Sequence, residues 1–286
     1  MTPPRWLYWP STASWTPADL ADLRAWYKAD AITGLSDGDP VSTWSDSSGG
    51  GYDLTQTSTA RPLYQTNTLN GLPVVEFDGS DDFIEASTAA DWAFLNTAGG
   101  AEVLAVWKAG TSADPEGINA LFATNRGSVL NQGAYTFHDS RSALPRDDVI
   151  ASAVRNSETG GTGDNYYLAP TGDDFMPANT AALLNVTFDC SNSTADYKVR
   201  HRLNGGTAVG GNTSTKTAST SNPLDPLRLG YLNGSVGFLN GYIAEVVICD
   251  ALLSGTDREK VEGYLAHKWG LESNLPSTHP YKSSAP

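Results

Sequence analysis

The chain is poor in the residues that sustain disulfide frameworks and membrane insertion. It has two cysteines in 286 residues, Cys190 and Cys249, which lie far apart and have no CxxC partner. Either they pair in the folded domain or both are buried free thiols, and the second interpretation is favoured because two cysteines form no disulfide framework. No apolar run approaches the roughly 20 residues that a membrane span needs, so we expect no membrane insertion.

Positive charge is also scarce. Lys and Arg number 18 against 32 Asp and Glu, which gives a formal net charge of -14. A nucleic-acid-binding protein gains its affinity from clustered Lys and Arg on the phosphates, and this composition therefore predicts no nucleic-acid partner. Residues 1–15 (MTPPRWLYWPSTASW) lack the basic start and the continuous apolar stretch of a signal peptide.

Turn-forming and aromatic residues, in contrast, are plentiful, with 28 glycines, 16 prolines and 8 tryptophans. From about residue 31, short apolar segments alternate with clusters of Gly, Asn, Asp and Ser. The expected strands are 74–77, 83–86, 102–108, 120–124, 135–138, 183–189, 197–203, 227–231 and 242–249. Such a series predicts an all-β protein, an antiparallel two-sheet β-sandwich of the jelly-roll type. Asn233-Gly234 and Asn240-Gly241 are typical of hairpin turns.

A short helix is expected on each side of this sandwich. In the first, Thr16 is the cap, Pro17 takes the first position and Asp19 the first turn. Its buried face would consist of Leu20, Leu23 and Tyr27.

The second helix precedes the C-terminus. Thr256 and Glu259 fit a capping box, and Gly270 stands where a left-handed C-terminal cap is wanted. Pro276 and Pro280 would keep the helix from resuming. Its apolar stripe is Val261, Tyr264, Leu265 and Trp269.

The domain organisation predicted is an aromatic N-terminal docking arm, residues 1–15, followed by one domain, residues 16–286. The arm holds four large aromatic residues without a period of 2 or 3.6, namely Trp6, Tyr8, Trp9 and Trp15. It cannot bury these rings against itself, so it is expected to dock on its own domain or on another subunit.

Four segments together resemble laminin-G-like, concanavalin A-like lectin-glucanase jelly-roll domains of bacteriophage virion proteins. They are residues 262–282 (EGYLAHKWGLESNLPSTHPYK), 41–50 (VSTWSDSSGG), 73–81 (PVVEFDGSD) and 241–253 (GYIAEVVICDALL). The resemblance implies a two-sheet jelly roll used in carbohydrate binding, adhesion or virion architecture, usually without catalysis. It covers the body from about residue 16 to residue 282, but no motif matches within about residues 111–182.

Catalytic constellations are weak, so no catalytic residue is assigned. Glu76 and Asp78 share a strand face, as the acidic pair of a related glucanase would, but Asp81 stands where a Glu is expected. The favoured interpretation is that Asp78 and Ser80 make a turn at the strand end. No Gly-x-Ser-x-Gly elbow is present, and no Cys/His spacing suggests zinc. The four histidines are expected to be structural or solvent-facing.

Calcium is the most plausible metal, although no cofactor is expected to be required. Asp78, Asp81 and Asp82 cluster in one turn, and hard cations take oxygen ligands of this kind. Acidic turns are common in a chain this acidic, which leaves a purely structural turn as the alternative.

A sugar site would need exposed aromatic platforms flanked by polar groups. The candidates form one group along the chain: Tyr166, Tyr167, Asp164, Asn165 and Arg155. The tyrosines could equally mark a short strand. Trp44 is expected in the core, with Asp46 capping the turn at residues 47–50. Phe77 is expected to be structural at its strand end, and Tyr264 and Trp269 to be buried anchors of the C-terminal helix.

The leading hypothesis is a non-enzymatic phage virion structural or decoration protein. It would be displayed on head or tail, contact other virion proteins through residues 1–15, and possess loops available to host-surface glycans. Its location would be the virion surface, reached by assembly and host lysis, and a homo-oligomer would suit such a particle. The alternatives are a bacterial surface adhesin and a glycan-active hydrolase or lyase that uses Glu76 and Asp78 or Glu245 and Asp250.

Overall fold

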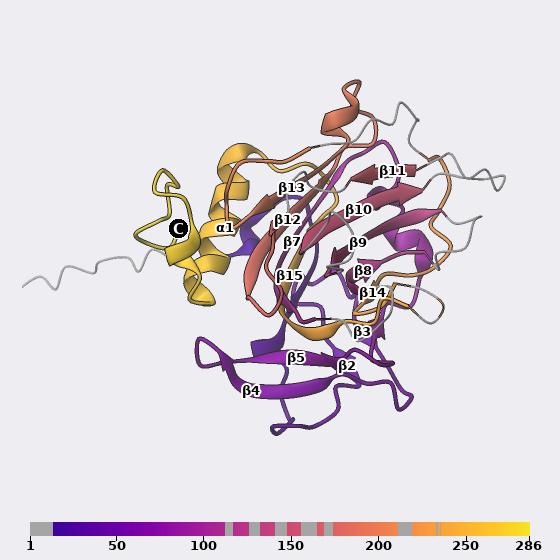
Figure 1. Ribbon diagram of the computed structural model, residues 1–286, viewed down its shortest axis with the longest axis vertical. Coiled ribbons are helices and arrows are strands. Elements are labelled where there is room, and N and C mark those ends of the chain that lie inside the picture. The colour runs from indigo at the N-terminus through magenta and orange to yellow at the C-terminus, as the bar shows by residue number, and fades with distance from the viewer. Residues whose placement is uncertain are drawn as a thin grey trace, which may run out of the picture.

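The computed structural model is a sandwich of two antiparallel β-sheets, with one α-helix and the C-terminal tail on the outside of one sheet (Figure 1). It describes residues 14–111, 117–125, 132–140, 148–155, 174–210, 219–232, 234 and 236–286, and the backbone of 165–168. The predicted fold class, an all-β two-sheet sandwich, is confirmed.

The first sheet has seven strands in the order β13-β12-β7-β15-β5-β4, and β1 also pairs with β15. Its strands are β1 (Leu23–Lys28), β4 (Leu63–Leu69), β5 (Leu72–Asp78), β7 (Ala101–Ala109), β12 (Ala182–Phe188), β13 (Val199–Leu203) and β15 (Asn240–Cys249). The long strand β15 pairs with β5, β7 and β1, so the sheet is organised around it.

The second sheet has eight strands in the order β11-β10-β9-β8-β14-β6-β3-β2. Its strands are β2 (Thr43–Trp44), β3 (Leu54–Thr55), β6 (Ile84–Glu85), β8 (Ile118–Ala123), β9 (Gly133–Asp139), β10 (Val149–Arg155), β11 (Asn165–Leu168) and β14 (Arg228–Leu229). All nine segments expected to be strands contain strand, and β11 is the short strand that was the alternative interpretation of the tyrosines. β1, β2, β3, β4 and β10 were not anticipated.

Helical structure is short except for α1 (Gly255–Lys268). The 3-10 turns are η1 (Pro17–Asp19), η2 (Ala29–Ala31), η3 (Ala89–Leu95), η4 (Ala195–Tyr197) and η5 (Glu272–Asn274). Across the described parts of the chain, no helix combines the length and the apolar character needed to span a membrane.

The predicted N-terminal helix is wrong. Its cap does form one turn, η1, in which the Asp19 carboxylate accepts the Thr16 N–H at 2.9 Å. The chain then becomes β1, where Tyr27 faces the core between the sheets and Trp26 faces the opposite side of the first sheet. A strand buried on both faces carries a continuous apolar run, and such a run imitates helical spacing.

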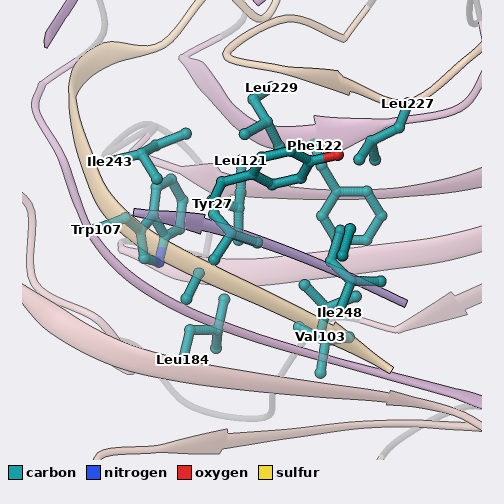
Figure 2. Close-up of a cluster of buried hydrophobic side chains, with 14 of the residues drawn as sticks. Tyr27, Val103, Trp107, Leu121, Phe122, Leu184, Leu227, Leu229, Ile243 and Ile248 are labelled. Carbon is teal, nitrogen blue, oxygen red and sulfur yellow. The ribbon is translucent and has the colours of Figure 1, made fainter. Parts of the chain in front are cut away.

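The core between the sheets is drawn from alternate residues of both layers. Figure 2 shows Val103, Trp107, Leu184, Ile243 and Ile248 of the first sheet packed toward the second. Leu121 and Phe122 both point inward from β8, because a register shift between Ala120 and Phe122 interrupts the alternation.

A second apolar layer lies between the first sheet and α1. The predicted stripe is largely correct, since Val261, Leu265 and Trp269 are buried and Tyr264 is half-buried. These side chains pack on the outward residues of β7 and β15, and Leu271 and Leu275 of the tail (residues 271–286) extend the cover. The tail and helix therefore close one outer face of the sandwich.

The start of α1 differs from prediction. Ser254, rather than Thr256, is the N-cap: its hydroxyl accepts the Asp257 N–H at 3.1 Å and lies 2.8 Å from an Asp257 carboxylate oxygen. The end is as predicted, because Gly270 has a φ of 71° and the Leu271 N–H donates to the Ala266 carbonyl at 2.7 Å.

One hairpin assignment is also wrong. Asn240-Gly241 lies at the start of β15, where the Gly241 backbone passes so close to Lys108 that a Cβ would overlap its carbonyl. A hairpin turn with positive φ at both central residues does occur at Asn70-Gly71, at 51° and 74°, between β4 and β5. Asn233 lies outside the described residues. Both cysteines are buried free thiols.

Candidate functional site

The outer face of the second sheet carries a hollow of about 520 Å³, called here the aromatic hollow. It is lined by Ala60, Asp81, Phe83, Glu85, Arg228, Tyr231, Gly234 and Phe238. β6 and β14 place its polar residues: Ile84 and Leu229 point into the core, so Glu85 and Arg228, paired across the two strands, point outward.

Three aromatic rings form one wall of the aromatic hollow. Tyr231 and Phe238 are stacked, with ring centroids 4.5 Å apart and an interplanar angle of 11°. Phe83 lies 5.5 Å from Tyr231 at 40°. All three side chains are only partly buried, so ring surface remains open to solvent.

A glycine sets the position of this wall. Gly230 has a φ of 83° and lies directly on the buried Phe77 ring, where a Cβ would overlap ring carbons. The Tyr231 hydroxyl donates to the Gly234 carbonyl at 2.8 Å and fixes the following turn. Phe77, predicted to be structural, therefore packs under the loop that carries Tyr231, which is far from it in the sequence.

The base of the aromatic hollow is a buried ion cluster. Arg228, whose side chain is 3% exposed, places Nη2 3.2 Å from Asp225 Oδ1 and Nε 3.5 Å from Glu85 Oε2. Its guanidinium carbon lies 5.3 Å from the centre of the Tyr231 ring. The ion pair holds Glu85, whose side chain is 38% exposed, beside Arg228, with part of its carboxylate open to solvent at the surface.

The acidic turn, Asp78, Asp81 and Asp82, adjoins the aromatic hollow through Asp81. One carboxylate oxygen from each residue lies within 4.8 Å of the others. Asp78 Oδ1 accepts the N–H of Ser80 at 2.8 Å, and Asp82 Oδ2 accepts the N–H of Asp78 at 3.0 Å. Burial and, secondarily, the charge of Asp78 raise the pKa of Asp82 to about 6. The turn is built by its own carboxylates, and its all-oxygen donor set suits a hard cation.

The sugar-binding residues predicted from the sequence lie on other strands of the same sheet. The register places Asn165 opposite Arg155 and Tyr167 opposite Ala153, and Asp164 lies outside the described residues. Arg155 stacks over Tyr135, its guanidinium carbon 5.6 Å from the ring centre.

Tyr135 pairs with Ala123, and Ala123 with Arg228. Tyr135 is therefore two strands, or about 10 Å, from the aromatic hollow. The register places Tyr166 opposite Val154, whose side chain is in the core, so the strand pairing does not gather the predicted group into one site. Arg155 and the hollow occupy separate places on the second sheet.

The residues predicted to be structural occupy two layers. Trp44 is wholly buried between the sheets. Asp46 accepts the Ser48 N–H at 2.8 Å and the Trp26 N–H at 2.9 Å, so it joins the 47–50 turn to β1. Trp269 is buried under α1.

Glu245, one of the carboxylates of the hydrolase alternative, does not face an open site. Glu245 is wholly buried, where it accepts the indole N–H of Trp26 at 2.6 Å and of Trp269 at 2.8 Å and ion-pairs with Lys268 at 2.7 Å. A register shift in β15 after Ile243 aims it at α1. Burial raises the pKa of Glu245 despite the lysine. Glu245 therefore holds the helix to the sheet.

A serine–histidine contact occurs where sequence reasoning found none, and it too is internal. Ser152 Oγ on β10 lies 2.7 Å from His201 Nε2 on β13, and both side chains are wholly buried. Burial lowers the pKa of His201 to about 3, so its ring is neutral. The pair connects the two sheets.

A second hollow, of about 410 Å³, lies where α1, β13 and the tail meet. Beneath it Glu262, 2% exposed, lies with Oε2 3.2 Å from His279 Nε2. His279 Nδ1 accepts the Tyr281 N–H at 3.2 Å, so the neutral ring carries its proton on Nε2 and donates it to Glu262. Glu262 Oε1 has no hydrogen-bond partner in the described structure. Burial raises the pKa of Glu262 to about 7, against the lowering effect of Arg202 and Arg258.

Comparison with known proteins bears on the fold. The sequence matches no protein-family model and no curated protein. The binding domain of paraclostridial mosquitocidal protein 1 has a similar structure, with a TM-score of 0.55 at 10% identity, over 87% of this chain and 53% of that one. Trypanosoma rangeli sialidase, in complex with 2,3-difluorosialic acid, has a similar structure with a TM-score of 0.50 at 13% sequence identity, over 88% of this chain and 34% of that one.

Ruminococcus gnavus IT-sialidase CBM40, bound to α2,3-sialyllactose, gives a TM-score of 0.46 at 12% identity, over 64% of this chain and 92% of that one. The chain spans about a third of the sialidase and about half of the mosquitocidal chain. At these identities the likeness shows the fold alone, a two-sheet β-sandwich.

Proposed function

We propose that this chain is a non-enzymatic, lectin-like domain that binds a glycan in the aromatic hollow. The observation that carries the proposal is the wall of Phe83, Tyr231 and Phe238 beside the partly exposed carboxylate of Glu85. A pyranose ring presents an apolar C–H face and a rim of hydroxyls, and these need an aromatic surface and fixed polar acceptors at its edge.

The size and stiffness of the aromatic hollow support the same conclusion. Its volume of about 520 Å³ falls in the range of small-ligand sites. The stacked rings and the ion-paired Arg228 are held before any ligand arrives, so little side-chain entropy is lost on binding.

Binding to a glycan array by the wild type and by Tyr231→Ala tests this function. Tyr197→Ala is the matched control, because Tyr197 is 48% exposed and lies on η4, outside the hollow. We expect wild type and Tyr197→Ala to bind the same glycans and Tyr231→Ala to bind about 5- to 30-fold more weakly, as the loss of a stacking ring costs on the order of 1–2 kcal/mol. Equal binding by all three proteins, or none by the wild type, would refute it.

Hydrolysis is the competing function, because Asp81 and Glu85 both line the aromatic hollow. A glycosidase needs one of its two carboxyls as a general acid at the scissile bond, whereas Glu85 lies against the guanidinium of Arg228, with Oε2 3.5 Å from Nε. Any glycan that binds should therefore be recovered intact after prolonged incubation. Cleavage by the wild type that Glu85→Gln abolishes would replace the binding function with an enzymatic one.

The finer proposal is that this domain is displayed on a bacteriophage particle, attached to capsid or tail proteins through residues 1–15. Its support is the resemblance of the C-terminal and Phe-Asp-Gly-Ser segments to virion jelly rolls. Residues 1–13 lie outside the described residues, and Trp15 packs edge-on against Tyr264 of α1, with ring centroids 6.5 Å apart. Purified particles should contain the protein in stoichiometric amount. Its confinement to the host cytosol, or to a bacterial surface, would contradict virion display.

Calcium at the acidic turn stays a prediction. Bound Ca²⁺ would relieve the repulsion among Asp78, Asp81 and Asp82 and raise the unfolding temperature. A thermal shift with calcium over EDTA, absent in Asp81→Asn, is the expected result. An equal melting temperature in calcium and in EDTA would remove the metal from this site.

A further inference from the structure

We infer that the aromatic hollow selects uncharged glycans and discriminates against those that carry carboxylate or sulfate groups. The inference rests on the proposed function, because it names the ligand class of that same site. It follows from the charges around the hollow and from the partners already taken by its one cationic lining residue.

Arg228 is the cationic side chain among the lining residues, and its charge is already matched. Two carboxylates, Asp225 and Glu85, lie within 3.2 and 3.5 Å of its guanidinium. Its guanidinium carbon also lies 5.3 Å from the centre of the Tyr231 ring, and only 3% of its side chain is exposed, although Nε and Nη2 have no hydrogen-bond partner in the described structure. An anionic sugar would have to displace one of these carboxylates to reach the guanidinium, so Arg228 does not provide an anion subsite.

The lining, together with the buried Asp225 behind Arg228, therefore carries an excess of negative charge. Asp81, Glu85 and Asp225 oppose one arginine, and Asp78 and Asp82 lie against Asp81 in the acidic turn. Asp81 is exposed and Glu85 is 38% exposed, so their charges face the open side of the hollow. A ligand carboxylate at that rim would meet like charge at close range.

The same groups suit a neutral sugar. Carboxylate oxygens are acceptors with several lone-pair sites each, so the exposed oxygens of Asp81 and Glu85 can each accept a ring hydroxyl. The C–H face of the same pyranose would lie on the rings of Phe83 and Phe238, which are partly open to solvent. A neutral pyranose therefore satisfies both walls without bringing a second negative charge.

A glycan array of matched pairs tests the inference, each neutral glycan being printed beside its sialylated and sulfated forms, with the full chain applied in EDTA. We expect the bound glycans to be neutral, and we expect their acidic counterparts to bind with an affinity at least about tenfold lower. A factor of this size is the effect of about one like-charge contact at a partly exposed site. The ratio should shrink in 1 M salt, where the Debye length is about 3 Å. Acidic forms bound as well as neutral forms would overturn the inference, whereas no binding at all would sink the proposed function.

Two variants identify the source of the discrimination. Glu85→Gln removes a rim charge and leaves Arg228 with one carboxylate partner, so the ratio of neutral to acidic binding should fall severalfold. Glu76→Gln is the matched control, because Glu76 is an exposed glutamate on β5 that does not line the hollow. An unchanged ratio in Glu85→Gln would contradict the charge argument. Repeating the array in calcium shows whether an ion at the acidic turn reduces the ratio, as added positive charge at that turn should do.

Discussion

Replacing the buried carboxylate under the C-terminal tail should change the pH dependence of folding. Glu262→Gln is expected to stabilise the domain at pH 8 and to leave its stability nearly unchanged at pH 4.5. The substitution removes a buried negative charge with one unpartnered oxygen, while the glutamine carbonyl still accepts the Nε2–H of His279.

The magnitude follows from the pKa of Glu262, which burial raises from 4.5 to about 7. Because the folded state holds this proton more tightly than the unfolded state, the wild type has its full folding stability from Glu262 below about pH 4.5, where both states are protonated. Its stability declines as pH rises through 7. The separation of about 2.5 between the two pKa values corresponds to about 3 kcal/mol by pH 8. Burial lowers the pKa of His279, which opposes this trend below about pH 6.5, but both proteins carry that group.

Urea unfolding of both proteins, followed by tryptophan fluorescence between pH 4.5 and 8.5, measures the difference in unfolding free energy. It should grow with pH in favour of the glutamine variant. Glu76→Gln, at an exposed position, should show no such trend. A difference that stays constant across this range, or a glutamine variant less stable than the wild type at pH 8, would refute the reasoning.

Two further substitutions and one truncation probe the packing. Gly230→Ala should destabilise the fold by about 1–3 kcal/mol, because its methyl group would overlap the Phe77 ring; an unchanged melting temperature would show that the loop can move aside. Truncation after Gly270 removes two buried leucines and should lower the free energy of unfolding by at least about 3 kcal/mol. An unaltered midpoint of chemical unfolding would show that the tail does not contribute to stability. Trp26→Phe leaves buried Glu245 without one indole donor and should cost about 1–3 kcal/mol, and the loss should be absent from a Glu245→Gln background if the indole acts through that carboxylate.

The sheet architecture was predictable because burial alternates along most of its strands. Val103 and Trp107 face one core while Leu104 and Val106 face the other, and such runs show in the sequence. The first strand was mistaken for a helix because apolar residues fill both of its faces.

The aromatic hollow could not be predicted in the same way. Asp81, Phe83 and Glu85 join Arg228 and Tyr231 only after more than 140 residues of intervening chain have folded between them. Taken alone, the segment around Glu85 and the segment around Arg228 each have the sequence pattern of an ordinary turn or strand end. The sequence-based sugar prediction instead followed a local cluster around Tyr166, which the pairing of strands places elsewhere on the same sheet.

The two outer faces of the sandwich differ, so the molecule has a covered face, called here its back, and an opposite face that carries the aromatic hollow. Helix α1 and the tail cover the first sheet (Figure 1). Trp15, next to the start of the described chain, packs on that helix, with the centre of its ring 5.8 Å from Lys260 Nζ. The aromatic hollow opens on the opposite sheet. A carrier joined to the chain ahead of Trp15 would hold the domain by its back, so copies arrayed on one surface would all present their hollows outward, and weak single contacts would add up to firm attachment.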